Sequence, residues 1–283
     1  HCHQVHTFVA DQCVLVGRLL GKPVFLTDHA GGDRNFNRRL QTFERATGFL
    51  LVSHFNAKGF APYRHKTRVI HGGVDTDRFK PIPVERRRTA LYAGRLMPYK
   101  GLQYLIEGVR PDTEVRFAGA SYHEDYYAHL QRIAAGRNVH FLGPLHGEDL
   151  VREYNQAGVV VLPSVEVDLY GKHYPKSEIL GLLLLEAMAS ETPVVCSAIG
   201  GMPELVIDGQ TGIVVPPGDS RALGDAVESL LNDPVQARRM GRLGREHVLS
   251  HFTWASVADR CLEAYVDLAG SSRASTTMHR AAT

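Results

Sequence analysis

Cysteine pairs are missing from this sequence. The cysteines are widely scattered and no two of them form a Cys-x-x-Cys motif, since they stand at Cys2, Cys13, Cys196 and Cys261. This spacing argues against a zinc module or a redox pair and favours reduced thiols in a cytosol over disulfide bonds. A bilayer-spanning apolar run, about 20 residues in a helix, is missing too. We therefore expect a soluble, cytoplasmic protein.

Neither a secretory signal nor a bound metal is indicated. The first residues, His1-Cys2-His3, already resemble the interior of a domain, so we expect no signal peptide before them. A metal could bind to His1, His3 and His6, but no carboxylate or thiolate completes a defined ligand set with them. We expect no metal and no other cofactor.

Charge is unevenly distributed, although the formal net charge is only +2. Residues 1–90 contain 15 Lys and Arg against 7 Asp and Glu, whereas the remainder contains 17 against 23. The basic residues of the first part include Arg34, Arg38, Arg39, Arg45, Lys58, Arg64, Lys66 and Arg68. They could contact an anionic membrane or a phosphate-bearing acceptor, or form an ordinary solvated face. Nucleic acid is not expected, because no nucleic-acid-binding motif accompanies the charge.

Two carboxylates, Glu178 and Glu186, flank an apolar run. On a continuous helix they would lie about 80° and ~12 Å apart, too far to act on one bond but suited to the two ends of a long ligand. Carboxylates accept hydrogen bonds from sugar hydroxyls, and Gly181 between them would let a phosphate approach the backbone. The alternative is an amphipathic helix with two solvated glutamates.

Two cations, Arg95 and Lys100, stand in a turn between a strand-like run and a helical pattern. Arginine offers a planar fork and lysine a point charge, a combination that suits a diphosphate. By themselves, the two residues could equally be surface charges.

Strand-like runs alternate with helical patterns after residue 88. The runs are 90–93, 115–118, 139–142, 159–162, 194–197 and 213–215. The alternation predicts a parallel sheet with helices on both faces and a ligand at the carboxyl ends of the strands. The turn with Arg95 and Lys100 follows the first run, and the segment 178–186 precedes the fifth.

These motifs, in this order, resemble the C-terminal half of glycosyltransferase family 4, the retaining GT-B enzymes also described as glycosyl transferases group 1. The resemblance covers about residues 69–268 and includes Gly94-Arg95-Leu96, Lys100-Gly101, Phe141-Leu142-Gly143, Val161-Leu162-Pro163-Ser164, Gly200-Gly201-Met202-Pro203-Glu204, Asp208-Gly209-Gln210-Thr211-Gly212 and Phe252-Thr253-Trp254. It implies an α/β fold of two Rossmann-like domains with parallel sheets, the first domain incomplete.

The resemblance also implies a domain organisation. Residues 1–74 would be the C-terminal part of the acceptor-side domain, 75–252 the donor-binding domain, and 253–269 a crossover helix that packs back on the first domain. The tail 270–283 lacks apolar periodicity, so we expect it to be disordered. About a hundred residues of a normal-sized first domain would precede His1, including the family's glycine-rich loop that closes over the donor. Without that loop, donor binding could survive while transfer fails.

The resemblance gives each matching residue a role. Arg95 and Lys100 would bind the donor diphosphate, Glu178 the transferred sugar, and Glu186 the ribose. Backbone groups at Gly94, Leu180, Gly181 and Leu182 would meet phosphate and sugar, while Leu142 and Gly143 would border the base. His29 would face the reacting sugar or the acceptor; the alternative is a loop histidine that caps a strand.

The implied activity is that of a hexosyltransferase, which moves a sugar from a nucleotide-diphosphate donor to a hydroxyl of a glycan, a lipid-linked acceptor or a small molecule. Such enzymes retain the anomeric configuration without a side-chain nucleophile or a metal, and some contribute to polysaccharide biosynthesis. The alternatives are a non-catalytic nucleotide-sugar-binding module and another GT-B enzyme, such as a nucleotide-sugar epimerase. The sequence specifies neither base, sugar nor acceptor.

One polar and aromatic segment, residues 166–176, precedes Glu178 and has no clear counterpart in the motifs above. It could be an ordered loop that tunes the choice of donor or an ordinary surface loop. A further departure is Glu191, where the family commonly has glycine; we expect its charge to face solvent.

Overall fold

The structure is a computed structural model that describes residues 1–29 and 41–280, with side chains up to Gly270. The chain divides into two compact units. Unit 1 comprises His1–Gly72 and Trp254–Thr283, and unit 2 comprises Gly73–Thr253. These divisions lie close to the expected domain bounds at residues 74 and 252.

Unit 1 contains a four-stranded parallel sheet whose strands follow one another in sequence order. The strands are β1 Cys2–His3, β2 Phe25–Thr27, β3 Gly48–Leu51 and β4 Thr67–Val69. The helices of this unit are α1 Phe8–Leu19, α3 Thr42–Arg45, α4 His54–Ala57, the 3-10 segment η1 Lys58–Lys66 and α12 Trp254–Arg280. The sequence pattern of residues 35–46 also predicts a helix, and part of this range lies outside the described residues.

Alternate side chains of β3 build two cores on the two faces of this sheet, as the period of a strand requires. Phe49 and Leu51 pack in a cluster with Val14 of α1. Leu50 packs in the other cluster with Val257 of α12. Helix α12 therefore lies on the first sheet. It continues to Arg280, past residue 269, where we expected a disordered tail.

Unit 2 contains a six-stranded parallel sheet in the order β10-β9-β8-β5-β6-β7. The strands are β5 Thr89–Ala93, β6 Glu114–Ala118, β7 Val139–Gly143, β8 Val159–Leu162, β9 Val194–Ser197 and β10 Gly212–Val215. Each coincides with a predicted run to within one residue at either end. The central strands are fully buried, which agrees with their continuous apolar sequence.

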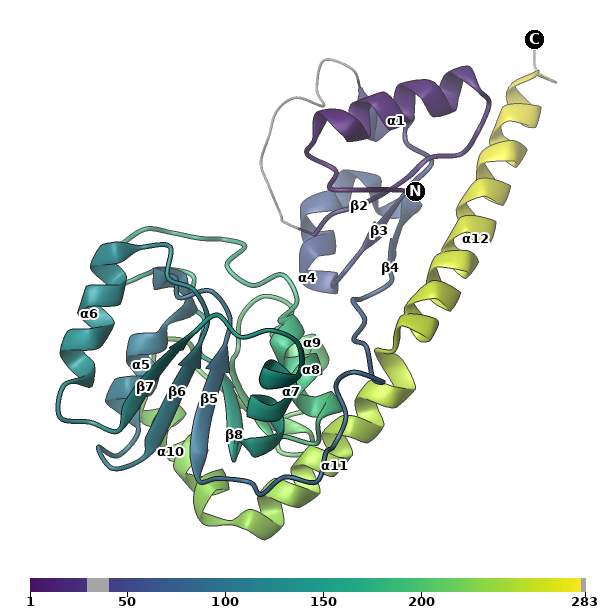
Figure 1. Ribbon diagram of the computed structural model, residues 1–283. Coiled ribbons are helices and arrows are strands. Elements are labelled where there is room, and N and C mark those ends of the chain that lie inside the picture. Colours follow the sequence, from purple (N-terminus) through teal and green to yellow (C-terminus); the bar gives the residue numbers. More distant parts are fainter. Residues whose placement is uncertain (30–40, 281–283) are drawn as a thin grey trace. The chain divides into compact units, whose positions relative to one another are not determined.

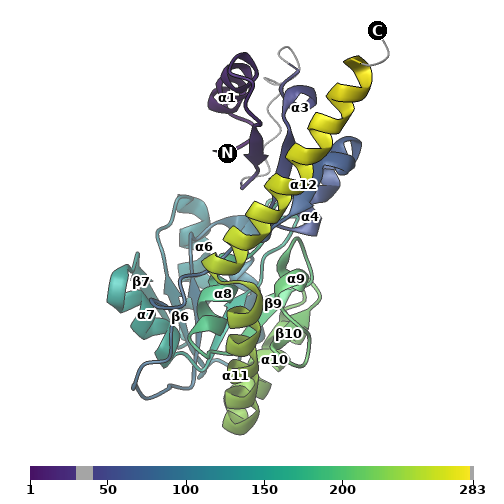
Figure 2. The same ribbon diagram turned by 90° about the vertical axis from the view of Figure 1, so that its right-hand side faces the viewer.

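Helices cover both faces of this sheet (Figures 1 and 2). They are η2 Pro98–Lys100, α5 Leu102–Gly108, α6 Glu124–Ala134, α7 Gly147–Gln156, α8 Leu182–Ala189, α9 Met202–Leu205, α10 Ser220–Asn232 and α11 Pro234–His251. Helix α5 packs against α6 and α10, while α8 packs against α7 and α11. No helix in the described part of the chain combines the length and the apolar composition that a membrane span requires.

The order of the strands defines a switch point between β5 and β8. The chain runs from β5 to β6 and β7 on one side, and then returns to β8, β9 and β10 on the other side. The connections at the carboxyl ends of β5 and β8 therefore leave the sheet in opposite directions, and a crevice forms between them. Both predicted motifs, the cations and the glutamate pair, lie in segments that follow these two strands.

Candidate functional site

Glycines line the carboxyl ends of three neighbouring strands. Gly94 follows β5 and donates a hydrogen bond from its N–H to the carbonyl of Ala118, at 2.8 Å. Gly119 follows β6 and donates to the carbonyl of Gly143, also at 2.8 Å. A Cβ atom on Gly119 would lie 1.8 Å from the carbonyl oxygen of Gly94, so only glycine fits there. Leu142 and Gly143 end β7 beside this layer, where a ligand would meet backbone rather than side chains.

Arg95 is the exposed cation of the site. Its backbone carbonyl accepts a hydrogen bond from the buried Tyr92 hydroxyl, at 2.8 Å, which holds the turn after β5. Its guanidinium donates a hydrogen bond from Nη2 to the hydroxyl of Tyr99, at 3.2 Å. The side chain is therefore oriented, yet most of its donors remain available to an anion.

Lys100 is the partly buried cation of the site. It ends η2, and the next residue, Gly101, has φ +65° and packs against the loop after β8. A Cβ atom on Gly101 would lie 2.2 Å from the carbonyl oxygen of Pro163. The ammonium of Lys100 donates to a carboxylate oxygen of Glu178. Both side chains are 13% exposed, so this ion pair is only weakly screened by water.

Glu178 lies in the loop before α8 and not on the helix, which corrects the expected spacing of about 80° and ~12 Å on one continuous helix. The helix begins only at Leu182, because Gly181 adopts φ +97°. The Glu178 carboxylate also accepts a hydrogen bond from the buried hydroxyl of Ser164, at 3.3 Å. Its backbone carbonyl accepts from the N–H of Gly201, at 3.2 Å.

The start of α8 adds backbone donors to this arrangement. The first N–H groups of a helix have no partner within the helix and carry a partial positive charge. Leu180 is buried, whereas the side chain of Leu182 is half-exposed. The loop with Glu178 and the start of α8 thus follow β8, and the ion pair joins this loop to the turn after β5.

Glu186 lies inside α8 and accepts a hydrogen bond from the hydroxyl of Tyr154 on α7, at 2.6 Å. Burial raises the pKa of Glu186, while Tyr154 and the Arg78 charge oppose this effect. The pKa of the fully buried Tyr154 is raised as well, first by desolvation and then by the Glu186 carboxylate. The two glutamates therefore differ: Glu178 is paired with a cation, whereas Glu186 is paired with a neutral hydroxyl.

His29 belongs to unit 1, where it follows β2. One ring nitrogen, Nε2, is hydrogen-bonded to Nδ1 of His3 at 2.8 Å, and the rings are stacked with centroids 5.1 Å apart. His1 stacks on the other side of His3, at 4.6 Å. Desolvation lowers the pKa of His29, and the neighbouring His3 charge adds to this effect. The role predicted for His29 at the reacting sugar or the acceptor stays a prediction.

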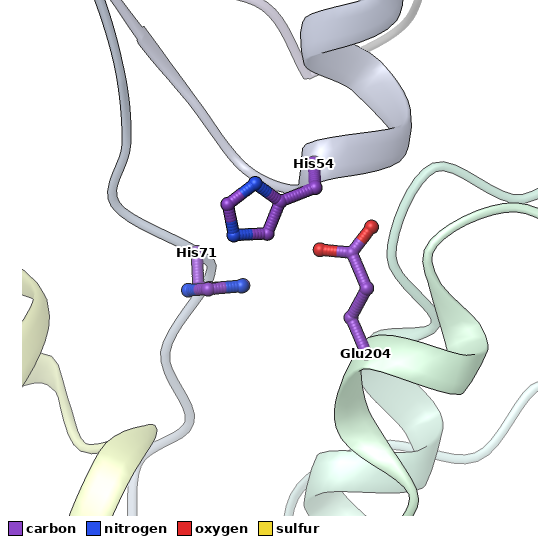
Figure 3. Close-up of side chains that lie close together, drawn as sticks. All are labelled: His54, His71 and Glu204. Carbon is purple, nitrogen blue, oxygen red and sulfur yellow. The ribbon is translucent and has the colours of Figure 1, made fainter.

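A second pair of histidines in unit 1 is drawn in Figure 3. His54 begins α4, His71 follows β4, and their ring centroids are 5.7 Å apart in an edge-to-face arrangement. Glu204, in the same picture, lies on α9 of unit 2. We assign no metal site to these residues.

Three residues around the site were not predicted from the sequence: Tyr99, Tyr154 and Ser164. Tyr154 and Ser164 hold the two glutamates through hydrogen bonds to side chains 32 and 14 positions away. Only Ser164 carried a signal, because it ends one of the motifs quoted above. Tyr154 lies within an ordinary amphipathic helix, and its buried hydroxyl is evident only once α7 packs on α8.

Comparison with known proteins decides the family. Residues 73–247 match the family model described as Glycosyl transferases group 1. The chain belongs to this family. The predicted family and the predicted α/β fold with parallel sheets are thus confirmed, whereas the roles of the individual site residues stay predictions.

By their names, the curated relatives of this chain are bacterial enzymes that act on sugars. It is 36% identical over 220 residues to the glycogen synthase of Mycobacterium tuberculosis (strain CDC 1551 / Oshkosh). This match covers 73% of this chain and 50% of the relative. It is 32% identical over 246 residues to the D-inositol 3-phosphate glycosyltransferase of Corynebacterium diphtheriae, with 77% and 53% covered. The chain spans about half the length of these curated relatives.

A solved structure supports the fold independently. The Anabaena protein HepE (Alr3699), crystallised in complex with UDP, superposes with a TM-score of 0.78 at 19% identity, and 91% of this chain and 76% of that chain are covered. At this identity the likeness shows the fold, which is GT-B.

Proposed function

We propose that this protein is a retaining glycosyltransferase that moves a hexose from a nucleotide-diphosphate sugar to a hydroxyl acceptor, and that unit 2 binds the donor. The observation that carries the proposal is the ion pair between Lys100 and Glu178 at the switch point of the sheet. A cation and a carboxylate held side by side offer neighbouring places for a phosphate and for the hydroxyls of a sugar.

Lys100 can serve the diphosphate without leaving Glu178. An ammonium has three donors, so one can remain on the carboxylate while the others bind phosphate oxygens. Arg95 adds a second, exposed cation on the same turn. As the glycosidic bond breaks, negative charge develops on the departing diphosphate. Fixed cations stabilise that charge more than they stabilise the bound donor, and this difference lowers the barrier.

Glu178 would then hold the transferred sugar through its second oxygen. Lys100 and Ser164 both bind Oε2, and no hydrogen bond to Oε1 occurs among the described residues. An ionised carboxylate oxygen accepts up to two hydroxyl donors. Glu186 would hold the ribose in the same way, with Tyr154 bound to its Oε2.

We propose that binding of the acceptor and the transfer of the sugar need residues outside unit 2. The retaining course, in which the leaving phosphate takes the proton of the acceptor, needs no side-chain nucleophile and no metal, and we propose it here with His29 near the reacting groups. The relatives named above act on different acceptors, so we propose only a hydroxyl. Peripheral contact of the basic residues of unit 1 with an anionic membrane likewise remains a prediction.

The experiment that tests donor binding is thermal unfolding of this chain with UDP, GDP and ADP, each with and without an attached hexose. A ligand at ~100 times its dissociation constant adds about 2.7 kcal/mol to the free energy of unfolding. We expect one base to stabilise the protein, and Glu186→Ala to abolish that effect. No stabilisation by any nucleotide would contradict the proposal. Binding with neither transfer nor donor hydrolysis, even in a full-length protein, would favour a nucleotide-sugar-binding module instead.

A further inference from the structure

Residues 166–174, between β8 and α8, form a short hairpin, named here the 166–174 hairpin. Val167 and His173 make an antiparallel bridge, and the N–H of Tyr174 donates to the carbonyl of Glu166 at 2.6 Å. The buried carboxylate of Asp168 closes the turn. These contacts satisfy the backbone of the segment internally, so it is an ordered element rather than an irregular surface loop.

The turn of the hairpin is built by one side chain. Asp168 Oδ1 accepts hydrogen bonds from the N–H groups of Tyr170 and Lys172, both at 2.9 Å. Gly171 lies between them with φ +78°, in the left-handed region that glycine tolerates. Asp168 is only 6% exposed, so replacement of its carboxylate would leave two backbone donors without their acceptor.

One end of the hairpin rests on the turn that carries the two cations. The ring of Tyr174 packs on the ring of Tyr99, with centroids 4.8 Å apart. The backbone adds a further link, because the N–H of Val165 donates to the carbonyl of Tyr99 at 2.8 Å. Tyr99, the middle residue of η2, is thus held against the hairpin by both its ring and its backbone carbonyl.

Tyr99 touches both cations of the site. Its hydroxyl accepts from Arg95 at 3.2 Å, and the ammonium of Lys100 lies 5.3 Å from the centroid of its ring. Aromatic faces attract cations at this distance, and the hydrogen bond restricts a long side chain that is otherwise exposed. A single ring, packed against Tyr174, therefore orients two positive charges.

The other end of the hairpin is fixed to a different strand connection. Tyr170 stacks on His123 with centroids 5.3 Å apart and planes 13° apart. His123 is the N-cap of α6, and its ring accepts a hydrogen bond from the N–H of Tyr126 at 3.2 Å. Two separate anchors hold the hairpin in register with the carboxyl ends of β5 and β6, so Tyr174 cannot shift freely along Tyr99.

We propose that Tyr174 and Tyr99 are positioning residues, which orient Arg95 and Lys100 for the diphosphate of the donor, and that the 166–174 hairpin is their support. This inference rests on the proposed function, since it assumes that the two cations meet a diphosphate. A hairpin with a purely structural role would instead affect every ligand of unit 2 to the same degree.

The test compares nucleoside diphosphates with their monophosphates, because the second phosphate is the group that the oriented cations are expected to bind. Isothermal titration calorimetry would measure UDP, GDP and ADP against UMP, GMP and AMP. For the base that binds, we expect Tyr174→Ala to weaken the diphosphate about five- to tenfold. The monophosphate should change less than twofold. Tyr174→Phe should retain the affinity of the unchanged protein, because it keeps the ring.

Two further variants serve as controls for this experiment. Leu169→Ala alters an exposed side chain of the same hairpin and should leave both affinities unchanged. If Tyr174→Ala does not fold, Tyr99→Phe keeps the ring but removes the acceptor of Arg95, and should lower the ratio of diphosphate to monophosphate affinity. Equal losses for both nucleotides, or an unchanged ratio in Tyr174→Ala and Tyr99→Phe, would overturn this inference while the proposed function stands. Failure of the unchanged protein to bind any nucleotide would overturn both.

Discussion

Lys100 and Glu178 form an ion pair across 78 positions of sequence, and each side chain is 13% exposed. The pair joins the turn after β5 to the loop after β8, the two connections that border the switch point. If this partly buried carboxylate loses its cation, the hydroxyl of Ser164 is the one side-chain donor that remains to it among the described residues. The pair therefore links the stability of this edge of unit 2 to the geometry of the proposed donor site.

A double-mutant cycle should reveal this coupling. Lys100→Met leaves the Glu178 carboxylate without its counter-charge, so we expect a loss of about 1–3 kcal/mol in the free energy of unfolding. Glu178→Gln alone leaves the ammonium unpaired in the same way. The double variant should lose less than the sum of the two single losses. Urea unfolding followed by circular dichroism measures all four proteins; additive losses would show that the pair contributes nothing.

The two glutamates should divide the donor between them. Glu186→Ala is expected to weaken free nucleoside diphosphate about tenfold or more, since it removes a partly desolvated acceptor of the ribose hydroxyls. Glu178→Ala should leave free nucleotide within about threefold and instead remove the affinity that the attached sugar adds. Glu148→Ala, on the exposed face of α7, is the matched control. Isothermal titration calorimetry with nucleotide and with nucleotide sugar measures these affinities. An equal loss of affinity for free nucleotide in both variants would contradict this division.

The raised pKa of Glu186 predicts a pH dependence of stability. The folded state holds the Glu186 proton more tightly than the unfolded state, whose pKa is near the ordinary 4.5. This contribution is fully present below that value and is lost as the pH rises through the folded pKa. Glu186→Gln cannot titrate, so its stability relative to the unchanged protein should increase as the pH rises from 4.5 toward neutrality.

Tyr154→Phe provides the second arm of this experiment. The hydroxyl of Tyr154 opposes the rise in the Glu186 pKa, so its removal should move the loss of stability to higher pH. Urea midpoints at several pH values measure both variants. A constant difference between Glu186→Gln and the unchanged protein would show that the Glu186 pKa is the same in both states.

Strands were predictable from the sequence because runs such as 159–162 and 194–197 are short, mostly apolar and rich in the β-branched residue valine. Helix α11 was not, because Asn232-Asp233-Pro234 is a pattern that indicates the end of a helix. The same Asp233 accepts hydrogen bonds from the N–H groups of Val235 and Gln236, and so also begins the next helix.

The local sequence pattern also gave a wrong prediction for Glu178, which it placed on a helix. The apolar run after Glu178 has helical character, but the positive φ of Gly181 starts the helix later, and periodicity does not reveal a backbone angle. The partners of Glu178 and Glu186 could not be predicted either. Lys100 and Tyr154 come from other strand connections, and which side chains meet there depends on the strand order of the whole sheet.

Gly200 offers a substitution test with an internal control. It has φ +60°, and a Cβ atom there would lie 1.7 Å from the carbonyl oxygen of Glu178. Gly209 has a similar φ of +72°, but no atom lies within 4 Å of its Cβ position. Both alanine variants carry the cost of a left-handed alanine, about 1 kcal/mol.

Only Gly200→Ala must also displace the backbone of Glu178, so it should lose about 2 kcal/mol more than Gly209→Ala in the free energy of unfolding. The folded fraction of Gly200→Ala should bind nucleotide sugar no better than free nucleotide, because the Glu178 carboxylate moves with its backbone. Gly209→Ala should keep the preference for the nucleotide sugar. Equal stability of the two variants, together with equal sugar preference, would mean that the segment 178–181 adapts to a Cβ atom, and that the tight contact with Gly200 does not position Glu178.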